Sequence, residues 1–94
     1  MATSAAGKRH LSLIHRLRCL ICFFCYGKTV PAHEAHHLEA YRGSHSAFAT
    51  VPLCKDCHDE LHRRRRRPFY LAHKVDDVTL LAWTIMLIEE EVCR

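Results

Sequence analysis

Residues 54–62 read Cys54-Lys55-Asp56-Cys57-His58-Asp59-Glu60-Leu61-His62, and this stretch decides the fold that the sequence predicts. Cys54 and Cys57 form a Cys-x-x-Cys pair, which can supply two thiolates to one zinc ion. His58 and His62 are four residues apart, so on a helix they lie on one face and can share a second ion. We therefore expect a turn and a helix, running from about Cys57 to Arg65, that carry ligands for two neighbouring metal sites.

An upstream cysteine group would complete the first of these sites. Cys19, Cys22 and Cys25 offer a second Cys-x-x-Cys pair in either of two registers. A glycine after the second cysteine suits a tight turn, so Gly27 favours the register that ends at Cys25. The sequence predicts a structural zinc site made of Cys54, Cys57, Cys22 and one of Cys19 or Cys25. The cysteine left over is expected to be a small buried apolar residue.

The second site needs a further histidine, and an adjacent pair, His36-His37, lies upstream. Residues 34–39 and 48–53 predict two short strands of an antiparallel hairpin, separated by the turn-forming residues Gly43, Ser44 and Ser46. Neighbouring residues on a regular strand point to opposite faces. Both histidines can therefore serve one phosphate only if the strand bends or ends there.

Helices are expected on both sides of this core, which spans residues 19–67. An apolar stripe predicts a helix from His10 to about Arg18, after a flexible tail over residues 1–9. Asp76 is a good N-cap for a C-terminal helix over about residues 76–92. That helix is apolar on two faces, and the simplest account is that it packs over the metal-binding core. The alternative is that the remaining face forms a homodimer.

With 94 residues, the chain is expected to form one domain in which a structural metal supplements a thin hydrophobic core. Six cysteines would suit a disulfide framework in a secreted protein. However, the first residues lack the pattern of a signal peptide, and no apolar stretch is long enough to cross a membrane. Metal-bound thiolates in the reducing cytoplasm are therefore the expected state of these cysteines.

The charge of the chain is divided unevenly. Residues 1–74 contain 13 Lys and Arg against 5 Asp and Glu, whereas residues 75–94 contain 1 against 5. Five consecutive arginines, Arg63 to Arg67, form a run that ends at Pro68. Such a run is often a solvated helix end or a localisation signal. Beside a metal site, it also predicts contacts to the phosphates of DNA, without base specificity.

The order of these motifs resembles that of the HNH endonucleases, and of small phage- and prophage-borne members in particular. The resemblance covers about residues 10–88, and its most specific part is the array of cysteines and histidines. Supporting segments are Leu17–Cys22, Ala35-His36-His37-Leu38 and Thr50-Val51-Pro52-Leu53-Cys54. The resemblance implies an α+β fold, namely the zinc-stapled, treble-clef-like ββα-metal domain. It also favours Cys19 with Cys22 as the first zinc-binding pair.

The resemblance further implies a metal-dependent endonuclease that hydrolyses DNA in a bacterial cytoplasm. By position, His36, His58 and His62 would hold one catalytic divalent ion (Mg²⁺, Mn²⁺, Ni²⁺ or Zn²⁺). Three protein ligands leave coordination positions open, as catalysis requires. His37 would be the general base, because an imidazole titrates near neutral pH.

Two features of the sequence leave alternatives open. The family has an Asn or Asp shortly before the segment that corresponds to Thr50, and residues 45–49 contain neither. A non-catalytic zinc module that binds nucleic acid is therefore the alternative function. In addition, His33-Glu34-Ala35-His36-His37 spells His-Glu-x-x-His, the pattern of zinc proteases, which requires a helix over these residues.

Overall fold

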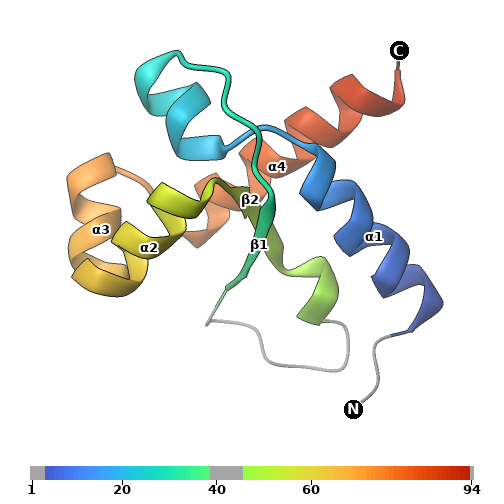
Figure 1. Cartoon of the computed structure of the whole chain (residues 1–94), viewed down its shortest axis with the longest axis horizontal. Helices are drawn as coiled ribbons and strands as arrows, with labels where there is room; N and C mark the ends of the chain where they lie inside the picture. Colours follow the sequence, from blue (N-terminus) through green and yellow to red (C-terminus); the bar gives the residue numbers. More distant parts are fainter. Residues whose placement is uncertain (1–3, 39–45, 94) are drawn as a thin grey trace.

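The structure is a computed structural model that describes residues 4–38 and 46–93. Its elements are α1 (Ala5–Arg16), η1 (Ile21–Cys25), β1 (Glu34–His37), η2 (Ser46–Phe48), β2 (Thr50–Leu53), α2 (Lys55–Arg64), α3 (Arg66–His73) and α4 (Asp77–Val92). Figure 1 shows the two strands in the middle of the molecule, between α1 and the pair formed by α2 and α3. The predicted α+β class, with helices flanking a hairpin and a helix, is confirmed.

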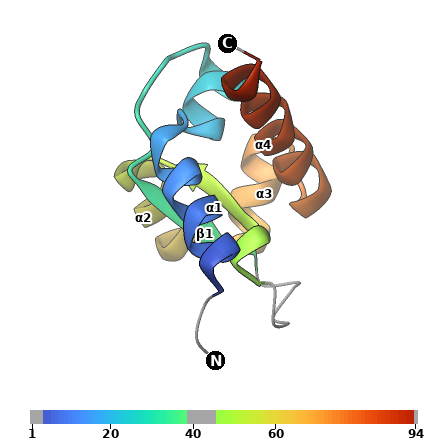
Figure 2. The same cartoon turned by 90° about the vertical axis from the view of Figure 1, so that its right-hand side faces the viewer.

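The sheet is a single antiparallel pair, β1 with β2, in which Glu34 faces Leu53 and His37 faces Thr50. The strands are shorter than predicted. One more backbone hydrogen bond, from Leu38 to Ala49, extends the pairing, and Phe48 already belongs to the η2 turn. The expected turn residues Gly43 and Ser44 lie outside the described residues. Figure 2 shows α1 lying along this sheet.

Helix α1 begins earlier than predicted, at Ala5, because Ser4 caps it by accepting a hydrogen bond from the Gly7 backbone N–H at 3.0 Å. The expected flexible tail over residues 1–9 is therefore wrong for residues 5–9, which are helical. The helix ends at Arg16, and Leu17 takes an extended conformation.

The arginine run does not form one helical end. Arg65 has φ 72° and ψ 160°, which interrupts the helix, and α3 starts at Arg66. Pro68 lies in the first turn of α3, where backbone N–H groups have no partner within the helix, so its missing N–H breaks no hydrogen bond.

Helix α4 covers the core with one of its two apolar faces. Asp76 caps the helix as predicted, accepting a hydrogen bond from the Thr79 N–H at 2.7 Å. Leu80 and Leu87 are buried, and they pack with residues from the sheet and the other helices, namely Ile14, Leu17, Leu20, Ile21, Val51, Leu53, Leu61 and Phe69. No helix among the described residues has both the length and the apolar character needed to cross a bilayer.

Candidate metal centres

Four cysteine sulfurs meet at the start of α2. The Sγ atoms of Cys19, Cys22, Cys54 and Cys57 all lie within 4.8 Å of one another. Cys22 Sγ is 3.8 Å from the sulfurs of both Cys54 and Cys57. A tetrahedral zinc ion with Zn–S bonds of about 2.3 Å requires sulfurs about 3.8 Å apart. The spacing therefore fits a structural metal ion such as zinc.

The local backbone explains why these four sulfurs converge. Cys54 is the N-cap of α2, and its sulfur accepts a hydrogen bond from the Cys57 N–H at 3.4 Å. The Cys19 N–H donates to the Val30 carbonyl, which fixes the segment before η1. Gly27 then turns the chain back with φ 67°, a conformation that glycine adopts without strain.

Cys25 is not part of the cluster. Its sulfur lies 3.9 Å from the His73 carbonyl oxygen and is not among the four sulfurs that lie within 4.8 Å of one another. The sequence left open whether Cys19 or Cys25 joins Cys22. The structure places Cys19 with Cys22 in the cluster. Gly27 had favoured Cys25, but this glycine serves the turn after η1.

The thiols affect one another's ionisation. A hydrogen bond from the Cys57 side chain lowers the pKa of Cys19 to about 5. Burial, and then the negative charge on Cys19, raises the pKa of Cys22 to about 12. The pKa of Cys57 is raised as well, first by its hydrogen bond to Cys19. A negative charge on one of these thiols therefore disfavours a second thiolate beside it, unless a bound cation compensates both charges.

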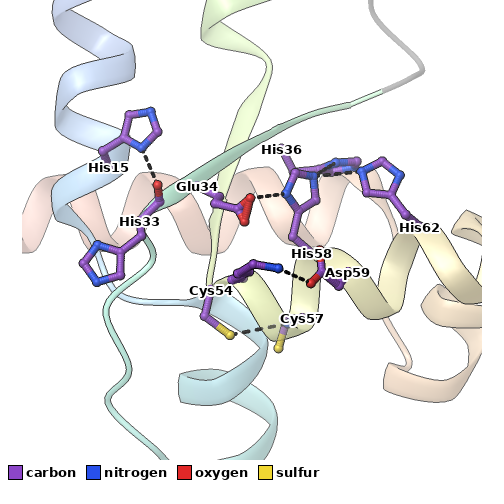
Figure 3. A network of polar contacts seen from close by, with 10 residues as sticks. His15, His33, Glu34, His36, Cys54, Cys57, His58, Asp59 and His62 are labelled. Carbon is purple, nitrogen blue, oxygen red and sulfur yellow. Dashed lines mark hydrogen bonds and ion pairs between the residues drawn. The ribbon is translucent and has the colours of Figure 1, made fainter.

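Three imidazoles form a separate group on the sheet side of α2. His36 Nδ1 is 3.3 Å from His58 Nε2, and His62 Nε2 is 3.0 Å from the same atom. Figure 3 shows the three rings converging from β1 and α2. Tetrahedral zinc with Zn–N bonds of about 2.0–2.1 Å has ligand nitrogens about 3.3–3.4 Å apart. The three predicted histidines are therefore close enough to share an ion.

Burial keeps the first of these histidines neutral. His36 is only 5% exposed. Burial, followed by the charges of His58 and His62, lowers the pKa of His36 to about 4. A neutral imidazole has a free lone pair, which is the form that binds a metal ion.

Glu34 completes this group, although the metal-ligand motifs of the sequence did not predict it there. Its Oε1 lies 3.3 Å from His58 Nδ1 (Figure 3). A carboxylate can only accept, so His58 carries its proton on Nδ1 and turns the Nε2 lone pair toward the other two rings. The available signal was the two-residue strand period, which places Glu34 and His36 on one face of β1.

His37 does not face this group. The alternation of β1 leaves His36 buried and His37 exposed, and His37 is the last residue of the strand. The zinc-protease interpretation of His-Glu-x-x-His is also excluded, because residues 34–37 form a strand and His33 has φ 58°. The helix that would align His33 and His37 on one metal does not exist.

The arginine run lies directly beside the histidines. A cavity of about 350 Å³ is lined by Leu61, His62, Arg65, Arg66 and Arg67. All five arginines of the run are exposed, and Arg66 lies 3.7 Å from the Asp77 carboxylate. Positive charge and one of the three histidines therefore share a single concave surface.

No protein-family model, curated protein or solved structure matches this chain. The HNH resemblance consequently stays a prediction that rests on the motifs. The fold and the two groups define the class of protein: a small α+β domain with four cysteines able to hold a structural metal ion such as zinc. Three neighbouring histidines in the same domain lie close enough to share a second ion.

Proposed function

We propose that the protein is a metal-dependent endonuclease of the HNH type that hydrolyses phosphodiester bonds in DNA. The observation that carries this proposal is the three-histidine group, which lies apart from the four cysteines and opens beside an arginine-lined cavity. A purely structural zinc domain needs only the cysteines. We further propose zinc in the cysteine cluster, and the cytoplasm of a bacterium, as host of a phage or prophage, as the place of action.

The residues of the site would divide the work between metal binding and DNA binding. His36, His58 and His62 would hold a divalent ion that supplies positive charge to the phosphate and the leaving oxygen. Glu34 would keep His58 oriented toward that ion. The arginines beside His62 would hold neighbouring phosphates of the DNA.

His37 would take the proton from the attacking water. It follows His36 directly, is the last residue of β1, and has an exposed side chain. For both histidines to serve one phosphate, the exposed His37 side chain would have to reach that phosphate from the end of β1. A general base typically contributes about 10²–10⁴-fold to the rate.

A plasmid-nicking assay with Mg²⁺, Mn²⁺, Ni²⁺ or Zn²⁺ tests this function. We expect cleavage by the wild type, and a loss of about 10²–10⁴-fold in His37→Ala with ion and DNA binding retained. His58→Ala should lose both the ion and cleavage. His15→Ala is the matched control, since His15 is exposed on α1 and contacts only the His33 carbonyl among the hydrogen bonds of the described residues. Undiminished cleavage by His37→Ala would show that another group is the base.

A zinc module that binds nucleic acid without cutting it is the second candidate. It is favoured by the position of His37 on the opposite face of β1 and by the lack of Asn or Asp among residues 46–49. His45, the remaining residue of that segment, lies outside the described residues. Wild-type protein that binds DNA but cleaves none with any of the four ions would establish this function instead.

We also propose that α4 forms a homodimer. Val78, Ile85 and Val92 are 75%, 58% and 69% exposed and follow one another at seven-residue spacing, as in a helix–helix seam. Glu89 and Glu91 flank this seam, so added salt should strengthen the dimer by screening their repulsion. Sedimentation equilibrium should show a dimer that Ile85→Lys converts to a monomer, and a wild-type monomer at all concentrations would refute it.

A further inference from the structure

A second cavity, of about 380 Å³, lies at the far end of α3 from the arginines. It opens between η1 and the turn that joins α3 to α4. Its lining includes Phe24, Tyr26, His73, Lys74 and Trp83. Neither metal group contributes to it, and the proposed cleavage reaction does not use it.

Aromatic rings form the walls of this cavity. Phe24 and Trp83 are stacked, with ring centroids 4.6 Å apart and planes 9° from parallel. Tyr26 is 61% exposed, although it lies edge-on to His73 at 5.9 Å. A tyrosine ring held at the mouth of an aromatic cavity presents a flat apolar surface to solvent. Such a surface fits another flat ring.

The polar part of the cavity is held in place from α2. The His73 side chain is only 7% exposed. Its Nε2 lies 3.2 Å from Glu60 Oε1, and its Nδ1 lies 3.4 Å from the Tyr26 hydroxyl. This chain of contacts fixes the positions of both rings before any ligand arrives. Ordering them upon binding therefore costs little conformational entropy.

The cavity also has positive charge at its edge. Lys74 ends α3 in the left-handed conformation, is exposed, and makes no ion pair with a described residue. Arg66 and Arg67 occupy the other end of α3, and its eight residues span about 12 Å. Helix α3 therefore has positive charge at both ends and an aromatic cavity beside one of them. Proteins that bind single-stranded nucleic acids combine these two features, because cations contact the phosphates and aromatic rings stack on the bases.

We propose that this cavity binds an unpaired base of single-stranded DNA, which stacks on Tyr26 while Lys74 contacts the adjacent phosphate. The inference rests on the proposed function in taking DNA as the partner, and it adds that the preferred DNA has unpaired bases. The strand would pass from the cavity along α3 to the arginines beside His62. A duplex keeps its bases stacked inside and cannot place one here without opening.

Binding of two labelled oligonucleotides of equal length, one of thymidines and one of abasic residues, tests the proposal. Their phosphates are the same, so a difference in affinity reports the bases alone. We expect the zinc-loaded protein, with no other divalent ion, to bind the thymidine strand about tenfold more tightly, the scale of one base–aromatic stack. Trp83 is the only tryptophan in the chain, so its fluorescence should change with the thymidine strand and not with the abasic one.

Variants locate the contact. Tyr26→Ala should remove most of the preference for bases, whereas Tyr26→Phe should keep it because the ring remains. Lys74→Ala should weaken both strands equally. His15→Ala, which removes an exposed side chain from α1 outside the cavity, is the control and should change neither.

The outcomes separate this inference from the proposed function. Equal binding of the two strands, or a Tyr26→Ala protein that keeps the full preference, overturns the base site even if plasmid cleavage is observed. Binding of neither strand overturns the DNA partner, and the base site with it. A base preference that Tyr26→Ala abolishes supports the site whether or not the protein cleaves DNA.

Discussion

The four-cysteine cluster and the three-histidine group both take residues from the start of α2 or from α2 itself. They differ in the number of coordination positions that they would leave free on a bound ion. Cys54 and Cys57 lie at the start of α2, and His58 follows at once, yet the cysteines and the histidines form two separate groups. Four thiolates fill a tetrahedron, so an ion among them has no position for substrate. Three imidazoles leave positions free, and His62 is exposed to solvent. The number of ligands and their exposure thus separate a site suited to stability from one suited to chemistry.

The largest effect is expected from removing one thiolate, which tests whether the cysteine cluster stabilises the fold. Cys57→Ser should lose bound zinc and most of the cooperative unfolding transition, because ion binding in small domains supplies folding free energy of about 10 kcal/mol. Zinc content and thermal unfolding measure both effects. Cys25→Ser is the matched control, since that sulfur lies outside the cluster. If Cys57→Ser melts like the wild type with its zinc retained, the cluster is not structural.

Removing one imidazole should instead affect the second ion and leave the zinc site and the stability unchanged. His58→Ala is expected to lose the second ion while keeping zinc and the melting temperature, because His58 is only half-buried and the thiolates are untouched. Isothermal titration with Mn²⁺ or Ni²⁺, together with zinc analysis, measures this. Loss of zinc in His58→Ala would mean that the two groups form one coupled centre.

A smaller effect is expected from the residue that orients His58. Glu34→Gln should weaken binding of the second ion by about 10–100-fold, the usual effect of removing a carboxylate behind a ligating histidine. The zinc cluster and stability should hardly change, as the Glu34 side chain is 35% exposed. Unchanged affinity would reduce the 3.3 Å contact between Glu34 and His58 to a surface ion pair.

The smallest effects on the two metal groups should come from the arginine run. Replacing Arg63, Arg64 and Arg67 by Gln spares Arg66, which lies beside Asp77. The salt dependence of DNA binding should flatten by about 0.9 log units for each phosphate that the variant no longer neutralises, for all sequences alike. Both metal groups should keep their ions. An unchanged slope would show that the run does not touch phosphates.

The sequence alone was sufficient for the ligand types and for their local spacing. Cys-x-x-Cys at a helix start, histidines four residues apart on α2, and Asp76 as an N-cap depend on neighbours within one turn, where chain geometry leaves little choice. The hairpin was also predictable, because strand patterns and turn residues are local. The strand alternation that separates His36 from His37 was foreseen for the same reason.

Only the tertiary structure decided between options that are locally equivalent. Cys19 and Cys25 are equally spaced from Cys22, and what selects Cys19 is its position relative to Cys54 and Cys57, more than thirty residues away. The break at Arg65 carries no glycine or proline signal at that residue, and the outward face of α4 is as apolar as the buried one. Glu34 contacts His58, which lies on a different element, α2. Spacing along the chain determines which residues can act together, whereas packing of distant segments determines which of them do.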